Sequence, residues 1–229
     1  MIGGALALGA AAWVSWAWLP HLLTPVCVWH GPRVGRRLAL TFDDGPDPDW
    51  TPRVLDALGE AGVRATFFLL GERAERAPAV VRRMAAAGHE IGNHSWSHRS
   101  FWLRGPRATA SEIRRAHECL GALAGAPPRH FRPPWGMVNA AMFPVLRRLG
   151  ERCVFWSIQP EGLRPVPPAR QIAHVMDHAH PGAIVDLHDA EGTREAPARL
   201  LAALPPLLEG LRERGYAFAT VVELLSTRD

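Results

Sequence analysis

Beyond residue 37 the chain alternates short apolar runs of strand length with longer segments whose apolar positions recur at helical spacing. The strand candidates are residues 38–42, 65–70, 89–92, 130–132, 153–158, 183–187 and 216–220. The helix candidates include residues 51–61, 78–87, 110–123, 139–149, 169–178 and 196–214. Such alternation indicates parallel strands joined by right-handed crossovers. The pattern predicts an α/β barrel of about seven strands, with its chemistry just beyond the carboxyl ends of the strands.

The first 30 residues have a different pattern. Residues 2–19 carry no charged side chain, and four tryptophans lie in or just after this run: Trp13, Trp16, Trp18 and Trp29. At ~1.5 Å per residue a helix of this length just crosses a bilayer, and tryptophan favours the membrane interface. We therefore predict that residues 1–30 are a membrane anchor or an uncleaved signal segment, and that residues 31–229 form the catalytic domain. A cleaved signal peptide and a buried core helix are the alternatives.

Charge and cysteine content add exclusions. The formal net charge is only +4 and the arginines are spread over helical segments, so no nucleic-acid partner is expected. The first positive charges after the apolar run are Arg33, Arg36 and Arg37, and the positive-inside rule alone would place the domain in the cytoplasm. The three cysteines, Cys27, Cys119 and Cys153, indicate neither a disulfide framework nor a zinc ribbon.

Two adjacent carboxylates, Asp43 and Asp44, follow the first predicted strand at a break marked by Gly45 and Pro46. Neighbouring residues at such a break can face different ways, so one carboxylate can bind a metal while the other handles a proton. An ordinary Asp-Gly-Pro turn explains the same residues equally well.

Two histidines, His94 and His98, follow the third predicted strand. Residues four apart share one face of a helical turn, where two imidazoles can bind one metal ion. His174 and His178 have the same spacing but lie inside a predicted amphipathic helix, before a strand rather than after one. We interpret this second pair as surface histidines.

Arg132 begins a stiff turn, Arg-Pro-Pro-Trp-Gly, after the fourth predicted strand. Its prolines fix the backbone, which suits an arginine that holds a carboxylate or a backbone N–H that meets an oxyanion. A structural turn with a packed tryptophan is the alternative.

The sixth predicted strand ends in Asp186, Leu187 and His188. Side chains alternate along a strand, so Asp186 and His188 share one face while Leu187 points to the other. A carboxylate beside an imidazole orients it and raises its pKa, which suits a general acid. Taken alone, His188 could equally be a hydrogen-bonded core histidine.

Taken together and in this order, the motifs TFDDGP, HSWSH, RPPWG and LHD resemble those of the polysaccharide deacetylase family, the NodB-homology or carbohydrate esterase family 4 enzymes. The resemblance implies a distorted (β/α)7 barrel of the NodB type, here with an apolar N-terminal helix. It implies hydrolysis of N-acyl, chiefly N-acetyl, groups on amino sugars of a cell-envelope polysaccharide or glycolipid. It also implies one divalent metal ion, Zn²⁺ with Co²⁺ or Ni²⁺ as alternatives, and a catalytic domain outside the cytoplasm.

The same resemblance assigns roles to individual residues. The family pattern makes Asp43 the catalytic base, Arg132 the residue that holds it, and His188 the general acid. It makes Asp44, His94 and His98 the metal ligands. The substrate pocket is expected to include Pro133, Trp135, Asp186 and Leu187, with the backbone N–H of Trp135 facing the oxyanion.

The chain departs from the family pattern at two places. Many members have an Asp-Trp pair whose Asp supports the catalytic histidine, and this chain has Gly162 and Leu163 there. Many members also have an apolar residue that lines the pocket for the acetyl methyl group, and this chain has Asp186 there. We expect Asp186, or else Glu161, to support His188. The polar pocket leaves open a related hydrolase of non-carbohydrate amides. A carbohydrate-binding protein with little turnover is the third hypothesis, although such a protein does not need Asp43 beside Asp44.

Overall fold

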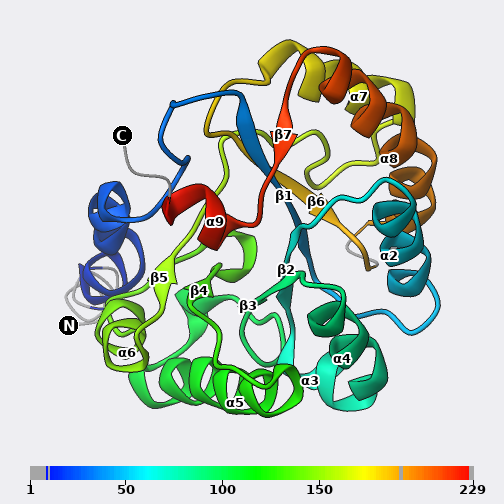
Figure 1. Ribbon diagram of the computed structural model, residues 1–229. Helices are drawn as coiled ribbons and strands as arrows, with labels where there is room; N and C mark the ends of the chain where they lie inside the picture. The colour runs from blue at the N-terminus through cyan, green and yellow to red at the C-terminus, as the bar shows by residue number, and fades with distance from the viewer. Residues whose placement is uncertain (1–8, 10, 191–192, 227–229) are drawn as a thin grey trace.

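The computed structural model describes residues 9, 11–190 and 193–226 of the chain. Its strands are β1 (Arg37–Asp43), β2 (Thr66–Leu69), β3 (Glu90–Asn93), β4 (His130–Phe131), β5 (Arg152–Cys153), β6 (Ile184–His188) and β7 (Ala217–Phe218). The described pairings are all parallel, in the order β5-β4-β3-β2-β1-β6, and β7 pairs with the first residues of β1. The strands form a curved sheet surrounded by helices, as Figure 1 shows. The expected parallel α/β architecture is therefore confirmed.

Except for the last helix, which follows β7, the helices lie between successive strands and cover the outside of the sheet (Figure 1). They are α2 (Thr51–Glu60), α3 (Gly71–Arg76), α4 (Pro78–Ala86), α5 (Pro106–Ala124), α6 (Met142–Leu149), α7 (Pro168–His178), α8 (Ala196–Glu213) and α9 (Val221–Ser226). Helices α2, α4, α5, α7 and α8 each have proline in the first turn, where its missing N–H removes no helical hydrogen bond. The six-residue helices α3 and α9 were not predicted, because so short a segment shows no helical periodicity.

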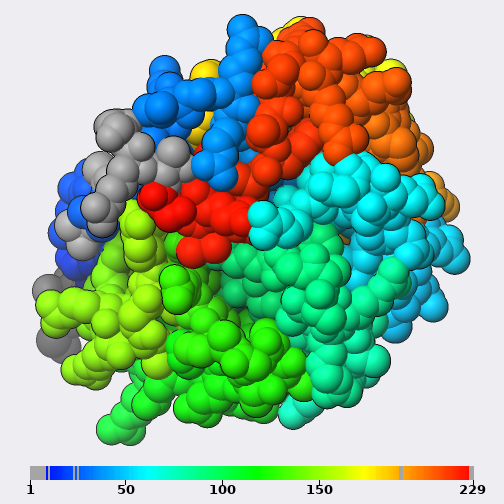
Figure 2. Space-filling view, viewed as in Figure 1, coloured from blue at the N-terminus to red at the C-terminus, as the bar shows by residue number. Residues whose placement is uncertain are grey.

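Alternate residues of β1 face two different cores. Leu38, Leu40 and Phe42 pack outward into the apolar layer between the sheet and the helices. Ala39 points inward, into an apolar cluster that also contains Val221 and other side chains of α9. Helix α9 bonds to the first residues of β2 and β3, so it covers the amino-terminal end of the barrel. Its atoms, in red, occupy the middle of the face in Figure 2. Side chains that face inward further along the strands therefore lie at the other end of the barrel, where α9 does not cover them.

The fifth strand is shorter than expected. Residues 153–158 were predicted as one strand, but β5 contains only two residues. Beyond it Val154 forms an isolated parallel bridge with Val28, and Ile158 forms another with Val185 of β6. The segment therefore leaves its neighbour β4 to pair first with the N-terminal segment and then with β6, and a continuous ladder cannot form.

The N-terminal segment does not form the expected membrane-spanning helix within the part of the chain that is described. None of the helices found there is long and apolar enough to cross a bilayer. Val14–Trp18 is a π-helix and Leu19–Val26 a 3₁₀-helix. Trp16 is tied to the domain, because its indole donates to the carbonyl oxygen of Arg104 (2.9 Å) and its own carbonyl accepts from the N–H of Ala140 (3.0 Å). Residues 1–8 and 10, the first part of the predicted anchor, lie outside the described residues.

Burial of His89 predicts a measurable pH dependence of stability. The ring is 7% exposed, and Nδ1 accepts the N–H of Ala65 at 3.1 Å. Burial, with smaller contributions from Arg64 and Arg83, lowers the pKa of His89 to about 4. The unfolded chain takes up this proton near pH ~6.5, so the contribution to stability is lost as pH falls from about 6.5 towards 4.

His89→Asn keeps an acceptor near Nδ1 but does not titrate in this range. We expect its unfolding temperature to fall less than that of the wild type between pH 6.5 and 4, as measured by circular dichroism. His178→Asn, at an exposed histidine, is the control and should keep the wild-type slope. Equal slopes for His89→Asn and wild type would show that His89 does not contribute.

Candidate active site

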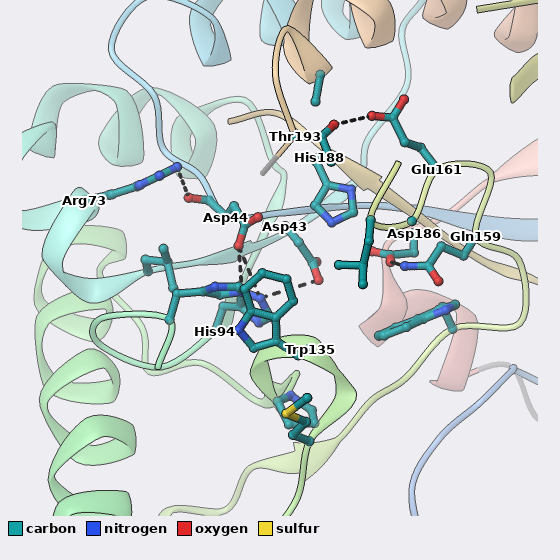
Figure 3. A pocket seen from close by; sticks show the side chains of 18 residues that line it. Asp43, Asp44, Arg73, His94, Trp135, Gln159, Glu161, Asp186, His188 and Thr193 are labelled. Atoms are coloured by element: carbon teal, nitrogen blue, oxygen red, sulfur yellow. Dashed lines mark hydrogen bonds and ion pairs between the residues drawn. The ribbon is translucent and has the colours of Figure 1, made fainter. Parts of the chain in front are cut away.

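The predicted site residues lie at the carboxyl ends of the central strands. Asp43 ends β1 and His188 ends β6, and the two are direct partners in the parallel register. Thr41 and Asp186 are partners two residues earlier, so all four side chains face the barrel interior at the end opposite α9. A cavity of about 500 Å³ opens there, and Figure 3 shows Asp43, Asp44, His94 and His188 around it.

Asp44, His94 and His98 converge on one point. Oδ1 of Asp44 lies 3.0 Å from Nε2 of His98 and 3.6 Å from Nε2 of His94. Ligands ~2.1 Å from a tetrahedral zinc ion are separated by about 3.4 Å, close to these distances. Oδ1 of Asp44 is buried and accepts no hydrogen bond from the described residues, which fits an atom that binds a cation. No other group of three candidate ligands is found in the described part of the chain.

The two histidines are brought together by a strained loop rather than by the helical turn that was predicted. Ser95 and His98 have φ values of 72° and 57°, in the left-handed region that non-glycine residues rarely adopt. Oδ1 of Asn93 accepts the N–H of Ser95, and Oγ of Ser95 accepts the N–H of His98. Nδ1 of His94 bonds to the carbonyl oxygen of Arg132 at 2.7 Å, which turns Nε2 towards Asp44.

Both imidazoles are suited to bind a metal in their neutral form. Burial lowers the pKa of His94 well below its ordinary value, and His98 adds to this effect. Burial also lowers the pKa of His98, opposed by the nearby carboxylate of Asp44. A neutral imidazole offers a lone pair to a cation without first losing a proton.

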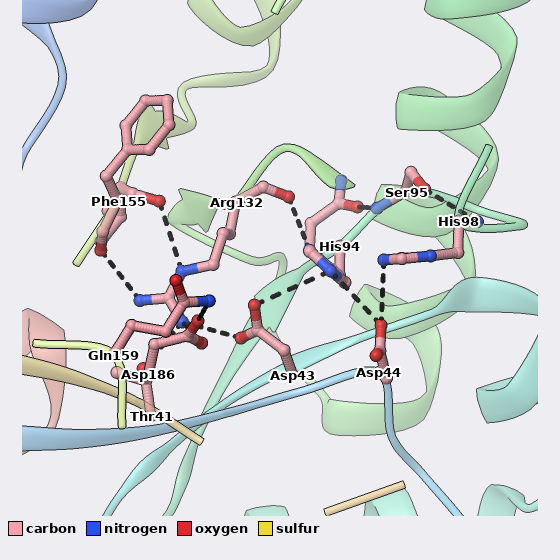
Figure 4. A network of polar contacts seen from close by, with 12 residues as sticks. Thr41, Asp43, Asp44, His94, Ser95, His98, Arg132, Phe155, Gln159 and Asp186 are labelled. Atoms are coloured by element: carbon pink, nitrogen blue, oxygen red, sulfur yellow. Dashed lines mark hydrogen bonds and ion pairs between the residues drawn. The ribbon is translucent and has the colours of Figure 1, made fainter. Parts of the chain in front are cut away.

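The side chain of Arg132 is completely buried beside the proposed metal site (Figure 4). Its Nη1 donates to Thr41 Oγ1 (2.7 Å), Asp43 Oδ1 (2.8 Å) and Asp186 Oδ1 (3.1 Å). Its Nη2 donates to the carbonyl oxygen of Phe155 (2.9 Å). Oδ1 of Asp43 is therefore fixed, while Oδ2 lies 3.7 Å from Nε2 of His94. The two oxygens of Asp43 thus face Arg132 and the group of Asp44, His94 and His98 respectively.

Asp43 lies in an environment that favours a proton. Burial raises its pKa well above the usual range, Arg132 opposes this, and the charges of Asp186 and Asp44 raise it further. A bound cation would act in the opposite direction, because it favours the ionised carboxylate.

The expected support of His188 by Asp186 or Glu161 is not found among the described contacts. Asp186 instead accepts from Arg132 through Oδ1 and from Gln159 Nε2 (2.9 Å) through Oδ2. The fallback candidate Glu161 is bonded to Gln171, Thr193 and Arg199. Asp186 and His188 stand side by side on β6. Asp186 nevertheless bonds to Arg132, because a buried guanidinium is a stronger hydrogen-bond partner for a carboxylate than an imidazole is.

The predicted pocket residues divide into two groups. Pro133, Trp135 and Asp186 line the cavity, and the ring of Trp135 is 52% exposed at a centroid distance of 4.8 Å from His98. Leu187 does not line it. Because side chains alternate on β6, Leu187 packs into the outer core with 4% exposure, so this geometry does not support its expected place in the substrate pocket.

The backbone of Trp135 is the second strained element of the site. Its φ of 60° lies in the left-handed region. The following amides are used in the turn, since Gly136 donates to Pro133 and Met137 donates to Pro134. The N–H of Trp135 has no acceptor among the described residues. Strain of this kind is typical of functional sites, and here it leaves a free donor beside the cavity.

Sequence reasoning missed four residues that contribute to the site. Thr41 faces inward two residues before Asp43, which strand alternation could have shown. Gln159 and Arg73, which donates to the carbonyl oxygen of Asp44 (2.9 Å), carry no signal in the sequence. Asp189 is buried against Thr51, and burial raises its pKa to about 7.

The rival histidine pair lies elsewhere, as expected. His174 and His178 are on α7 with rings stacked at 4.3 Å, and His178 is exposed. Neither belongs to the group around Asp44.

Comparison with known proteins agrees with the geometry. The family model described as polysaccharide deacetylase matches residues 30–154. A peptidoglycan-N-acetylglucosamine deacetylase of Bacillus cereus is 36% identical over 204 residues, which cover 88% of this chain and 94% of that protein. A chitooligosaccharide deacetylase of Azorhizobium caulinodans is 35% identical over 187 residues, covering 78% and 89% respectively.

Solved structures show the same fold. The Bc1960 peptidoglycan N-acetylglucosamine deacetylase, in complex with 4-naphthalen-1-yl-N-oxidanyl-benzamide, has a TM-score of 0.84 at 32% identity and covers 92% of this chain and 99% of its own. A family 4 carbohydrate esterase from Streptomyces lividans in complex with acetate has a TM-score of 0.74 at 31% identity, covering 82% and 93%. From sequence motifs, site geometry and relatives alike, the chain belongs to the polysaccharide deacetylase family.

Proposed function

We propose that this protein is a metal-dependent hydrolase that removes N-acyl groups from amino sugars of a cell-envelope polysaccharide. The observation that carries the proposal is the convergence of Asp44, His94 and His98 beside Asp43, whose position is fixed by a buried arginine. Relatives named as deacetylases of peptidoglycan and of chitooligosaccharides support an N-acetylated glycan as the substrate class. We extend this class to glycolipids that present the same N-acyl sugar.

Asp44, His94 and His98 would hold one divalent cation, for which we propose Zn²⁺, with Co²⁺ and Ni²⁺ as alternatives. Two nitrogens and one carboxylate oxygen are a common ligand set of catalytic zinc. When bound, the cation polarises the amide carbonyl and lowers the pKa of water.

Asp43 would take the proton from the attacking water. Its Oδ1 is held by Arg132, so its Oδ2, which faces the triad, is the atom available for this transfer. The water oxygen would then add to the carbonyl carbon, and the free N–H of Trp135 would donate to the oxygen that becomes negative.

His188 would deliver the proton that the departing amine requires. It lies across the register from Asp43 and lines the cavity, so the base and the acid stand on neighbouring strands. Breakage of the C–N bond leaves a free amine on the sugar and a carboxylate product.

The division of roles between the paired carboxylates is testable with two variants. Asp43→Asn should lower kcat by about 10²–10⁴-fold and retain metal, because Asp43 acts on the water. His94→Ala should lose metal and turnover together. The measurements are acetate released from N-acetylglucosamine oligomers and peptidoglycan, and bound zinc by mass spectrometry.

His174→Ala is the matched control and should retain both metal and turnover. Equal metal loss in Asp43→Asn and His94→Ala would contradict the separation of roles. A metal-loaded wild type that releases acetate from none of the glycans would contradict the proposed activity itself.

Asp186 would make the acyl pocket polar. Its two oxygens bond to Arg132 and Gln159, yet each carboxylate oxygen can accept a further hydrogen bond. We therefore propose that the pocket favours an acyl group with a hydroxyl, such as N-glycolyl, over N-acetyl.

Asp186→Leu should shift selectivity towards N-acetyl by about tenfold or more, measured as the ratio of kcat/KM for N-glycolyl and N-acetyl sugars. Total turnover should also fall, because Arg132 loses one acceptor. Gln159→Leu, which leaves the contact between Arg132 and Asp186 in place, should change selectivity less. An unchanged selectivity ratio in Asp186→Leu would show that the carboxylate does not contact the acyl group.

Attachment to a membrane through the N-terminal segment remains a proposal. It is supported by exposed apolar side chains there, including Trp18 (52%), Leu22 (64%) and Val26 (75%), and by the absence of any acidic residue before Asp43 in the sequence. Trp-rich surfaces without negative charge favour the interface of an anionic bilayer. Because the proposed substrate is a cell-envelope polymer, we place the catalytic domain outside the cytoplasm.

Sedimentation of the full chain with vesicles of phosphatidylglycerol tests this attachment. We expect most of the protein to sediment, and a triple variant, Trp18→Ser, Leu22→Ser and Val26→Ser, to remain largely in solution. Leu163→Ser, which removes an equally exposed apolar side chain outside the segment, should sediment like the wild type. If the triple variant binds as well as the wild type, these side chains do not contact the bilayer.

A further inference from the structure

Two cysteines far apart in the sequence lie side by side where the N-terminal segment meets the sheet. Val28 is paired in parallel with Val154: its N–H donates to the carbonyl oxygen of Cys153 (2.8 Å), and its carbonyl accepts from the N–H of Phe155 (2.7 Å). In this register Cys27 is the direct neighbour of Cys153.

The packing of the flanking residues confirms that the two thiols share one face. Cys27 and Cys153 belong to the same apolar cluster, and Val28 and Val154 belong together to a different one. Neighbouring strands are ~4.8 Å apart, within the ~4.4–6.8 Å between Cα atoms that a disulfide spans. Both conditions for a cross-link, a common side and a suitable separation, are therefore met.

The thiols also interact with each other. A hydrogen bond with Cys153 lowers the pKa of Cys27, while burial raises the pKa of Cys153 well above the usual range. Cys27 is therefore the thiol that ionises first, and the thiolate is the form that attacks a disulfide.

We propose that Cys27 and Cys153 form a disulfide in an oxidising environment and thereby fasten the N-terminal segment to β5. A small-molecule disulfide, such as oxidised glutathione, is the oxidant. The Cys27 thiolate attacks one of its sulfurs and releases the first thiolate. Cys153, as its thiolate, then attacks Cys27 Sγ and releases the second. The two cysteines lose two protons and two electrons in total, and the oxidant is reduced to two thiols.

Access to the pair depends on local opening. Cys27 and Cys153 are 6% and 8% exposed, so a reagent reaches them when the short pairing of Val28 opens or before the chain has folded. Once formed, the bond would close a loop that contains the first four strands, and so constrain the unfolded chain strongly.

The cross-link would also stabilise a support of the active site. Phe155 follows the cysteine pair by two residues, and its carbonyl oxygen accepts from Nη2 of Arg132. Its ring is stacked on Trp29 of the N-terminal segment at a centroid distance of 4.3 Å. The disulfide would join the N-terminal segment, which carries Trp29, to β5, which leads to Phe155, and so hold the two stacked rings together.

The test uses the full chain after treatment with oxidised or reduced glutathione. Free thiols are alkylated under denaturing conditions and counted by intact mass, and digestion locates the linked peptides. We expect one free thiol, Cys119, after oxidation and three after reduction, together with a peptide that joins Cys27 to Cys153. The oxidised form should unfold at a temperature about 5–15 °C higher than the reduced form.

Cysteine variants provide the controls. Cys119→Ser should still form the bond, whereas Cys27→Ser and Cys153→Ser should keep two free thiols and lose the redox dependence of the unfolding temperature. Should a serine variant not fold, peptide mapping of the wild type decides alone. Three free thiols after oxidation, even when the chain is refolded with the oxidant present, or a cross-link through Cys119, would overturn the proposal.

Discussion

The buried guanidinium of Arg132 is the interaction on which the rest of the site depends. A fully buried cation is tolerated only when its donors and its charge are matched, and here a hydroxyl, two carboxylates and main-chain carbonyls do this. The side chain thereby fixes Asp43, and the carbonyl oxygen of the same residue fixes the ring of His94. One residue thus links the proposed base to the proposed metal triad, and its rigid fork lies against the ring of Phe68 at 4.2 Å.

Backbone strain is concentrated at the same place. Five non-glycine residues have positive φ values in the described chain, and four of them, Asp44, Ser95, His98 and Trp135, are at the site. Each conformation costs on the order of 1–3 kcal/mol and persists only where surrounding contacts enforce it. The contacts are visible: Arg73 holds the carbonyl of Asp44, and Asn93 holds the amide of Ser95. The packing of the rest of the barrel offsets the free energy that these strained conformations cost.

The barrel and most of the site could be predicted from the sequence because strand alternation and motif spacing are local signals. The inward face of Asp186 and His188 followed from a period of two, and the place of His94 and His98 from the end of a strand. The choice of Asp44 as the third candidate ligand came from the resemblance to the family. What failed depended on contacts between distant segments. The two side-chain partners of Asp186, Arg132 and Gln159, come from other segments of the chain. The meeting of Cys27 with Cys153 depends on how an irregular segment pairs, and the N-terminal run was judged on hydropathy although its described part packs on the domain.

The two departures from the family pattern together amount to moving one carboxylate within the site. The chain lacks the carboxylate expected at position 162, beside the proposed acid, and has one at position 186, beside the proposed base. Asp43, Asp44 and Asp186 bring three negative charges, which Arg132 and a divalent ion together would balance, whereas Arg132 alone would not. In the metal-free protein burial raises the pKa of Asp43, Arg132 opposes this rise, and the charges of Asp186 and Asp44 add to it. Asp186 thus makes the ionised state of the base more dependent on the metal than a leucine at that position would. His188 makes no side-chain hydrogen bond to Asp186 or Glu161 among the described contacts, so it can take its orientation from the substrate that enters the cavity.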